Sequence, residues 1–292
     1  MARQRSGRRP VAGAAAPDDI AGTVAIDSGT AVITTDPDGQ GWLLEVNGVQ
    51  SSHLAADPTR LDFEYMRWIA AVVADRFDLG GPLRALHLGA AGCALPRHLA
   101  AVAPASRHVA VEIDAALADL VRARFDIPRA PIVRLRVGDA RDVTEGLTPG
   151  SRDLVVVDVF AGARTPAHLT TVEFFDAIHR VLRPGGVVVM NVADTRDLAY
   201  ARRQIATVAD GFTHLMLVAD PAMLKGRRYG NIVVAASDDP LPASPALVRG
   251  LLVDAVPASV RDGAAAHAFT AGARPYTDAD PPTDRGTPLI PV

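Results

Sequence analysis

The sequence contains one cysteine, Cys93, among 292 residues. A single thiol excludes an intramolecular disulfide and any metal site built from several cysteines. Long apolar runs are also missing, because Gly, Pro or a charged residue interrupts each run before the roughly 18–20 residues that a membrane span needs. Residues 1–10 are basic, but residues 11–17 are too weakly apolar for the core of a secretory signal. We therefore expect a cytoplasmic protein with no membrane partner.

The sequence also has no excess of positive charge. The formal net charge is -3 at pH 7, which argues against a general nucleic-acid-binding protein. The histidines lack the short spacing of a helical zinc site such as His-Glu-x-x-His, so we expect no metal. With 49% hydrophobic residues, the chain can bury a full core, and a globular protein acting on small molecules is the class that remains.

Composition divides the chain into four segments. Residues 1–20 are expected to be a flexible leader, and residues 261–292 a Pro-rich C-terminal tail. Between them, short strand-like runs separated by Asp-Ser-Gly, Asp-Pro-Asp-Gly and Asn-Gly turn signals predict a small N-terminal β unit over residues 21–60. These runs are Thr23–Ile26, Ala31–Thr35 and Trp42–Val46. The main domain is then expected over residues 61–260.

The main domain opens with apolar residues at helical spacing over residues 61–77. Apolar strands then alternate with helix-like segments, a rhythm typical of a parallel sheet covered by helices on both faces. The sequence Thr170-x-x-Glu173 predicts a capping box at the start of one helix. The last two strands, His214–Ala219 and Asn231–Ala236, have no helix between them, so they should pair antiparallel.

This pattern predicts an α/β fold of the class I AdoMet-methyltransferase-like (Rossmann-like) type. We expect a seven-stranded sheet that ends in an antiparallel hairpin, together with the small N-terminal β unit. Open parallel sheets bind ligands at the carboxyl ends of their strands, where the loops converge. The residues that end the strands are therefore the candidates for a binding site.

The first three strands of the main domain end in residues suited to a nucleoside. Gly89, Ala90 and Gly92 form a small-residue turn that lets a ligand approach the backbone and the next helix. Glu112 follows Gly89 by 23 residues, close to the spacing at which an acid accepts hydrogen bonds from ribose hydroxyls. Asp139, followed by Ala140, is placed to accept from an adenine amine. We interpret these residues as the binding site of an AdoMet-type donor.

Simpler interpretations of the same residues remain open. A lone Gly-x-x-Gly can serve close packing of a strand on a helix, and Glu112 can cap the next helix, although Asp114 is better placed for that. Asp139 can belong to an ordinary turn. Asp158 ends the fourth strand, where a carboxylate faces the reacting end of the expected pocket.

Four motifs resemble the spermidine synthase family of polyamine aminopropyltransferases, and the likeness covers about residues 41–238. They are Val-Glu-Ile-Asp at 111–114, Gly-Asp-Ala at 138–140, Asp-Leu-Val-Val-Val-Asp at 153–158 and Leu-Arg-Pro-Gly-Gly-Val at 182–187. The resemblance implies that decarboxylated S-adenosylmethionine donates an aminopropyl group to a small-molecule amine acceptor. It implies a catalytic Asp158 that takes a proton from the amine, Gln50 and Tyr65 on the substrate side, and a homodimer through the N-terminal β unit.

The sequence departs from the family pattern at two positions. Gly92 stands where the family carries an Asp that holds the donor's aminopropyl nitrogen, and Ala161 replaces a second acceptor-binding Asp after the fourth strand. Intact S-adenosylmethionine carries a carboxylate that such an Asp would repel, so an AdoMet-dependent methyltransferase is the alternative. A nucleoside-binding homologue without turnover also fits. An NAD-dependent enzyme fits less well, because Gly89-Ala-Ala-Gly is an imperfect Gly-x-Gly-x-x-Gly.

Overall fold

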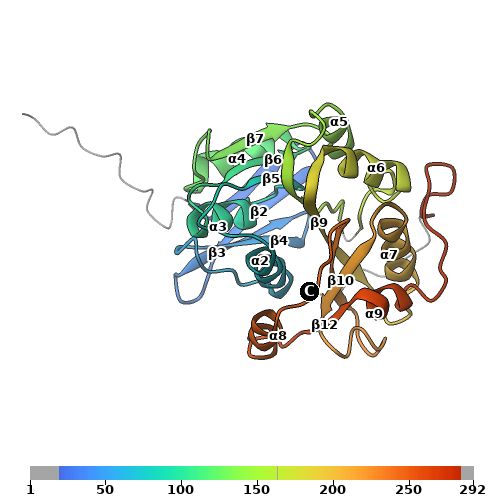
Figure 1. Cartoon of the computed structure of the whole chain (residues 1–292). Coiled ribbons are helices and arrows are strands. Elements are labelled where there is room, and N and C mark those ends of the chain that lie inside the picture. Colours follow the sequence, from blue (N-terminus) through green and yellow to red (C-terminus); the bar gives the residue numbers. More distant parts are fainter. Residues whose placement is uncertain (1–19, 163, 284–292) are drawn as a thin grey trace, which may run out of the picture.

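The N-terminal sheet is an antiparallel meander of β1 (Gly22–Ile26), β2 (Gly29–Thr35), β3 (Gly41–Val46) and β4 (Val49–Ala55) (Figure 1). The computed structural model describes residues 20–162 and 164–283. The strand β4 was missed by the sequence pattern, which predicted three strands. Its sequence is mostly polar, and a two-residue turn joins it to β3, with Asn47 and Gly48 at φ 52° and 76°. Positive φ at both positions is typical of the tight turns of β-hairpins.

The larger sheet has eight strands within the described residues, in the order β12-β10-β11-β9-β8-β5-β6-β7. Strands β5 to β9 pair in parallel, whereas β9-β11, β11-β10 and β10-β12 are antiparallel. The predicted fold class and the predicted hairpin are therefore confirmed, with β12 added to the seven expected strands. The bounds are β5 Arg84–Leu88, β6 Arg107–Glu112, β7 Val133–Val137, β8 Arg152–Val157, β9 Leu182–Asp194, β10 His214–Ala219, β11 Gly230–Ser237 and β12 Ser259–Asp262.

Helices cover both faces of the larger sheet. Helices α2 and α3 are neighbours on one face, and α5, α6 and α7 pack side by side on the other. Asp114 caps α4 by accepting from the Leu117 N–H, and Ser244 caps α8 in the same way. The bounds are α2 Glu64–Arg76, α3 Ala94–Val102, α4 Ala115–Arg124, α5 Ala140–Glu145, α6 Val172–Val181, α7 Ala199–Gly211, α8 Pro245–Leu252 and α9 Gly263–Ala268, with a 3₁₀ turn at Ala167–Leu169.

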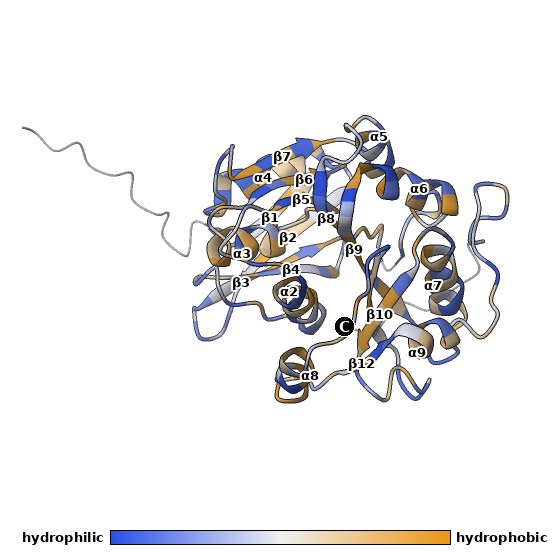
Figure 2. Cartoon of the chain, viewed as in Figure 1, coloured by the Kyte–Doolittle hydropathy of each residue, from blue (hydrophilic) through white to orange (hydrophobic). Residues whose placement is uncertain are grey.

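The central strands are buried on both faces. In β8, residues 153–157 are all buried, so the strand reads as a continuous apolar run after Asp153, as parallel strands covered on both sides do. Figure 2 shows orange, hydrophobic colouring on the strand labelled β10, whose last five residues are buried. A second apolar cluster joins the N-terminal sheet to α3 and α4, with Ile33, Leu44 and Leu54 on one side and Cys93 and Val121 on the other. The N-terminal sheet therefore shares its core with the main domain.

The C-terminal segment differs from the predicted tail. The expected boundary at residue 260 falls inside β12, and α9 and a buried Tyr276 follow it. Asp278 accepts from the Thr171 hydroxyl, and its own N–H donates to Glu173. The predicted capping box of Thr170 and Glu173 is wrong, because the Thr170 hydroxyl donates to the Ala167 carbonyl, Glu173 accepts from Asp278, and α6 has no side-chain cap. Residues 1–19 of the expected leader and residues 284–292 lie outside the described residues.

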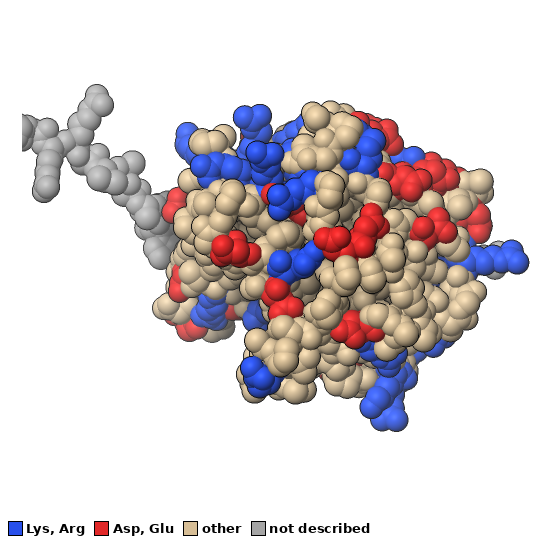
Figure 3. All heavy atoms as spheres, in the orientation of Figure 1, with Lys and Arg blue, Asp and Glu red and all other residues tan. Residues whose placement is uncertain are grey.

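Charge is unevenly distributed on the surface. Figure 3 shows basic side chains gathered over the region where Figure 1 places β7 and α4. The strand β7 forms one edge of the larger sheet, and it exposes Arg134 and Arg136. Charged side chains on an edge strand discourage pairing with another chain. None of the helices in the described part of the chain combines the length and hydropathy that a bilayer crossing requires.

Candidate active site

A cavity of about 440 Å³ lies at the carboxyl ends of β5, β6, β8 and β9. Residues of β4 and of the start of α2 also line it. This is where an open parallel sheet binds ligands. Most of the predicted site residues line it: Gln50, Tyr65, Gly89, Ala90, Glu112, Asp139, Ala140 and Asp158. We call the part formed by Gly89–Ala91, Glu112, Asp139 and Ala140 the β6–β7 end. The part formed by Glu64, Tyr65, Asp158, Asn191 and Asn231 is the β8–β11 end.

The turn after β5 is held tightly against the end of β8. Gly89 adopts φ +86°, and a Cβ added to it would lie 2.1 Å from the carbonyl oxygen of Asp158. Only glycine fits this close approach without a shift of the backbone. Ala91 and Cys93 also adopt left-handed conformations, with φ 38° and 58°. The turn therefore brings its backbone to the pocket at the expense of local strain.

Glu112 fastens this turn to the end of β6. Its Oε2 accepts from the Ala91 N–H at 2.8 Å, and its Oε1 accepts from the Asp114 N–H at 3.1 Å. The helix cap of α4 is Asp114, so Glu112 does not serve as that cap. Each carboxylate oxygen has a further lone pair, which leaves capacity for a ligand hydroxyl in the pocket.

Gly92 is the predicted cofactor-binding residue that the structure does not bring to the pocket. It is buried under β4, and its N–H donates to the Ser52 hydroxyl at 3.0 Å. An added Cβ would lie 2.6 Å from the Ser52 Cβ and 2.8 Å from a Leu54 methyl carbon. The expectation that Gly92 contacts the donor is therefore wrong in geometry, because this position faces the N-terminal sheet.

Asp139 is both a helix cap and a pocket residue. Its Oδ1 accepts from the backbone N–H groups of Arg141 and Asp142, and its Oδ2 lies 2.8 Å from His168 Nε2. Burial alone would raise its pKa, but the hydrogen bonds from His168 and from the two N–H groups outweigh burial and lower it. These bonds confirm the turn interpretation of Asp139, and the same side chain also lines the pocket.

Asp158 is the central carboxylate of the β8–β11 end. Its Oδ2 accepts from the Tyr65 hydroxyl at 3.2 Å and its Oδ1 from Asn191 Nδ2 at 3.0 Å. Burial raises the pKa of Asp158 to about 6, although both hydrogen bonds lower it. Burial, together with the Asp158 charge, raises the pKa of Tyr65 well above its ordinary value, so the phenol keeps its proton and donates. The structure thus joins two residues that are 93 positions apart in sequence.

Three polar residues of this end were missed by the sequence analysis. Asn191 lies in the part of β9 that the pattern predicted as a strand end, so the rule applied to the other strands would have found it. Glu64 directly precedes Tyr65 in the first turn of α2. Its Oε1 accepts from Asn231 Nδ2 at 3.2 Å, which links α2 to β11. No signal in the sequence pairs these two residues.

The pocket lining carries negative charge. Glu64, Glu112, Asp139 and Asp158 line it, and the described lining residues include neither lysine nor arginine. The lining histidines are His87 and His168. Burial lowers the pKa of His87 well below its ordinary value, and His168 is paired with Asp139. This balance suits a ligand that carries positive charge at the β8–β11 end.

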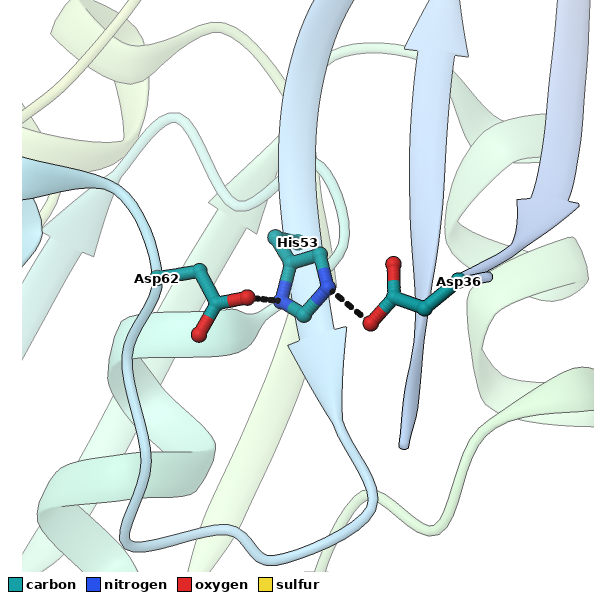
Figure 4. Close-up of side chains that lie close together, drawn as sticks. All are labelled: Asp36, His53 and Asp62. Atoms are coloured by element: carbon teal, nitrogen blue, oxygen red, sulfur yellow. Dashed lines mark hydrogen bonds and ion pairs between the residues drawn. The ribbon is translucent and has the colours of Figure 1, made fainter. Parts of the chain in front are cut away.

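A cluster of His53, Asp36 and Asp62 lies beside the pocket (Figure 4). His53 Nε2 is 2.8 Å from Asp36 Oδ2, and His53 Nδ1 is 3.2 Å from Asp62 Oδ2. Figure 4 shows one carboxylate beside each ring nitrogen of His53. The cluster links β4 to the residue that follows β2 and to the segment that leads into α2.

Comparison with known proteins agrees with the fold of this chain. A family model described as "Methyltransferase domain" matches residues 86–190. The structure of a probable spermidine synthase from Corynebacterium glutamicum ATCC 13032 is 44% identical, with a TM-score of 0.84, and the match covers 92% of this chain and 99% of that one. A polyamine aminopropyltransferase of Vibrio vulnificus is 33% identical over 136 residues, 46% of each chain, so the match spans about half of that relative's length. A spermidine synthase in complex with the transition state analogue AdoDATO shares the fold, at 16% identity and a TM-score of 0.57 over 78% of this chain and 77% of that one.

Proposed function

The chain belongs to the spermidine synthase family of polyamine aminopropyltransferases, and on that premise we propose that it transfers an aminopropyl group from decarboxylated S-adenosylmethionine to a small amine. The observation that carries this proposal is the charge of the pocket lining. Four carboxylates line the cavity, with no lysine or arginine among its described residues. Decarboxylated S-adenosylmethionine and an alkyl amine are both cationic near neutral pH, whereas intact S-adenosylmethionine adds a carboxylate that these residues repel.

The β6–β7 end would bind the adenosine part of the donor. Glu112 is fixed by two backbone N–H groups and keeps lone pairs for the ribose hydroxyls. Asp139 and the backbone before Ala140 lie where the adenine ring would end, with an oxygen able to accept from its amine. The turn at Gly89 and Ala90 would pass beside the sulfonium and its sugar. None of these groups needs to move to serve this role, because each is held by the fold.

Asp158 would act as the base at the β8–β11 end. A protonated amine first binds the carboxylate and gives it one proton. The freed nitrogen lone pair then attacks the aminopropyl carbon bonded to sulfur, a C–N bond forms and the C–S bond breaks. The electron pair of the broken bond returns to sulfur, which leaves as the neutral thioether methylthioadenosine. The product is a protonated secondary amine, and the proton on Asp158 passes to solvent.

The pKa of Asp158 suits this task. A base works best when its pKa lies near the working pH, and burial raises that of Asp158 to about 6. Tyr65 and Asn191 hold the carboxylate from two sides and so fix the direction in which it accepts a proton. Positioning the amine beside the sulfonium carbon then supplies much of the rate.

The test is release of methylthioadenosine from decarboxylated S-adenosylmethionine with putrescine as the acceptor. We expect turnover that depends on both substrates and on Asp158. Binding of the nucleoside without any methylthioadenosine, over a panel of mono-, di- and triamines, would contradict the proposal and favour a homologue without turnover.

Methyl transfer is the second candidate, because the methyltransferase family model matches residues 86–190 and Ala161 adds no carboxylate to the pocket. It predicts S-adenosylhomocysteine as the product from intact S-adenosylmethionine. The same amine panel with that donor tests it, and formation of S-adenosylhomocysteine at a rate above that of methylthioadenosine would establish it.

A further inference from the structure

The strand β7 lies at one edge of the larger sheet, and among the described residues it pairs only with β6. Two hydrogen bonds fix the direction of its backbone groups. The His108 N–H donates to the Ile132 carbonyl, and the Gly138 N–H donates to the Glu112 carbonyl. Backbone groups of successive residues point to opposite sides of a strand. Residues 133, 135 and 137 therefore direct their N–H and C=O groups away from β6, towards the open edge.

Part of this open edge is already used by the fold. The Val133 carbonyl accepts from the Arg122 guanidinium at 3.5 Å, which agrees with its outward direction. The outward groups of Leu135 and Val137 have no such partner in the described part of the chain, because no strand lies beyond β7. The C-terminal half of β7 is therefore free to pair with a further strand.

Arginines gather on one face of the sheet at this edge. Arg134 and Arg136 share a face of β7, because side chains two residues apart point the same way. Arg134 pairs with Val109 of β6, which follows Arg107 by two residues, and Arg107 pairs with Arg84 of β5. The register therefore places four arginines on the same face of three neighbouring strands, and all four are exposed. We call Arg84, Arg107, Arg134 and Arg136 the arginine band.

The positive charge of the arginine band is not balanced within the fold. Arg134 and Arg136 form no hydrogen bond or ion pair with the residues that the structure describes. The Arg107 guanidinium donates only to the neutral Ser106 carbonyl. Figure 3 shows basic side chains gathered over this region of β7 and α4. Like charges held close together repel one another, so an anionic partner would be stabilised here.

The spacing of the charges matches an extended peptide. Alternate residues of a strand are about 6.6 Å apart and point to the same face. An added strand with an acid at every second position therefore repeats its carboxylates at the interval of Arg134 and Arg136, while its backbone pairs with residues 135 and 137. An apolar strand would desolvate the arginines without a partner, so they select against it. A nucleic acid would use the charge alone, and the net charge of -3 gives the chain no overall attraction for a polyanion.

We propose that the β7 edge is a docking site for an extended acidic segment of a partner protein. The segment adds a strand to the larger sheet and places its carboxylates against Arg134 and Arg136. In this mode of recognition, main-chain hydrogen bonds give affinity and alternate side chains give specificity. The docking site is independent of the reaction proposed above, because neither arginine lines the pocket.

The experiment measures the Kd of two labelled heptapeptides for the full-length protein by fluorescence anisotropy. The peptides have equal composition and charge: in one, glutamate alternates with valine, and in the other, four glutamates precede three valines. We expect the alternating peptide to bind at least about tenfold more tightly, because only its carboxylates repeat at the interval of Arg134 and Arg136. Its binding should also slow hydrogen exchange of the Leu135 and Val137 amides, since strand addition pairs them.

Two variants separate the contribution of charge from that of the backbone. The double variant Arg134→Gln/Arg136→Gln should weaken binding of the alternating peptide by about 10- to 100-fold. Val137→Pro keeps both charges and removes one outward N–H, which an edge strand tolerates, and should weaken binding by about three- to tenfold. Arg249→Gln is the matched control, because Arg249 is exposed on α8, outside the arginine band, and it should change the Kd by less than about twofold.

Equal affinity for the two peptides would overturn the proposal, and so would wild-type affinity in the double variant. Tighter binding of poly(U) RNA than of the alternating peptide, lost in the same variant, would assign the arginine band to nucleic acid and would also overturn it. A thermal melt of each variant shows whether it is folded, so that a loss of binding reports on the edge itself. If Val137→Pro does not fold, the double variant and the exchange of the Leu135 amide still decide the outcome.

Discussion

The carboxylates at the two ends of the pocket differ in their hydrogen-bond donors and in the direction of their pKa shifts. At the β6–β7 end, Glu112 and Asp139 accept hydrogen bonds from backbone N–H groups of the turn and helix beside them. At the β8–β11 end, Asp158 accepts from the neutral side chains of Tyr65 and Asn191. The pKa of Asp139 is lowered, whereas burial raises that of Asp158 to about 6. Aspartates at the ends of two strands of one sheet are therefore prepared for different tasks.

The difference follows from where the stabilising groups come from. Backbone N–H groups are fixed by the secondary structure, so the β6–β7 end is complete before any ligand binds. The groups of the β8–β11 end come from α2, β8, β9 and β11, and they leave negative charge without a cationic partner among the described residues. We propose that the β6–β7 end recognises the donor and that the β8–β11 end reacts with a cation. Substitutions at the two ends should therefore have separable effects.

The largest expected effect is that of Asp158→Asn. The amide cannot take a proton, so we expect kcat for methylthioadenosine release to fall by about 10²- to 10⁴-fold. The Kd of decarboxylated S-adenosylmethionine, measured by calorimetry, should change by less than about tenfold, because the β6–β7 end and the other lining carboxylates are retained. A comparable loss of donor affinity would show that the two ends do not act separately.

Asp158→Asn should also change stability in a pH-dependent way. Burial raises the pKa of Asp158 from its ordinary value of 3.8 to about 6, so the buried charge destabilises the fold above pH 6. This cost is relieved as the pH falls through 6 towards 4. The variant should therefore be more stable than the wild type at pH 8, by on the order of 1–3 kcal/mol. At pH 5 this difference in stability should be smaller. Thermal melts at the two pH values test this, and a constant difference would contradict it.

The next largest effect is expected from Gly89→Ala, which disturbs the turn at the β6–β7 end. The new Cβ would collide with the Asp158 carbonyl oxygen, so we expect a loss of about 1–3 kcal/mol in stability and weaker donor binding. Gly39→Ala is the control, because Gly39 also has positive φ, at +67°, but no atom within 4 Å of the added Cβ. If both variants lose the same stability and donor affinity, the close approach to β8 is not what makes Gly89 necessary.

A smaller effect is expected from Tyr65→Phe, which alters only the reactive end. The Tyr65 hydroxyl favours the charged form of Asp158, so removing it should raise the pKa of that carboxyl further. The acidic limb of the kcat/KM profile should then move to higher pH, with a loss of about tenfold at pH 7 and little change at pH 9. A uniform loss across the pH range would assign Tyr65 to substrate packing instead.

The smallest effect is expected from Asp139→Asn. The amide oxygen can still cap α5, since Asn is as good a capping residue as Asp. Only the charge that faces His168 and the adenine site is lost. We expect a two- to fivefold weaker Kd for the donor and an unchanged kcat, measured by calorimetry and by methylthioadenosine release. An altered kcat would mean that this end also affects the chemistry.

The fold was predictable where the apolar pattern was strong. The strands β10 and β11 and their antiparallel pairing followed from two apolar runs with no helix between them. Asp158 followed from its position at a strand end and Tyr65 from the family resemblance, and the hydrogen bond between them joins a helix start to that strand end. By contrast, β4 is mostly polar, because its residues serve the turn and the pocket, so no apolar alternation marked it.

The missed features depend on contacts between distant segments. The C-terminal segment was predicted to be a tail because of its prolines, yet Asp278 binds Thr171 and Arg141, and those partners are not visible in local composition. Gly92 was assigned to the donor by its place in a motif, but the packing of β4 against that turn decides which way it faces. Glu64 was missed for the same reason, since only the fold brings Asn231 beside it.

The most direct test is a calorimetric comparison of the two donors at pH 7.5 on the wild-type protein. The pocket presents four carboxylates with no lysine or arginine among its described lining residues, so decarboxylated S-adenosylmethionine should bind at least about tenfold more tightly than S-adenosylmethionine. Methylthioadenosine, which carries neither charged group, should bind with an affinity set by the β6–β7 end alone. Equal or tighter binding of intact S-adenosylmethionine would contradict the central claim that the β8–β11 end is built for a cation.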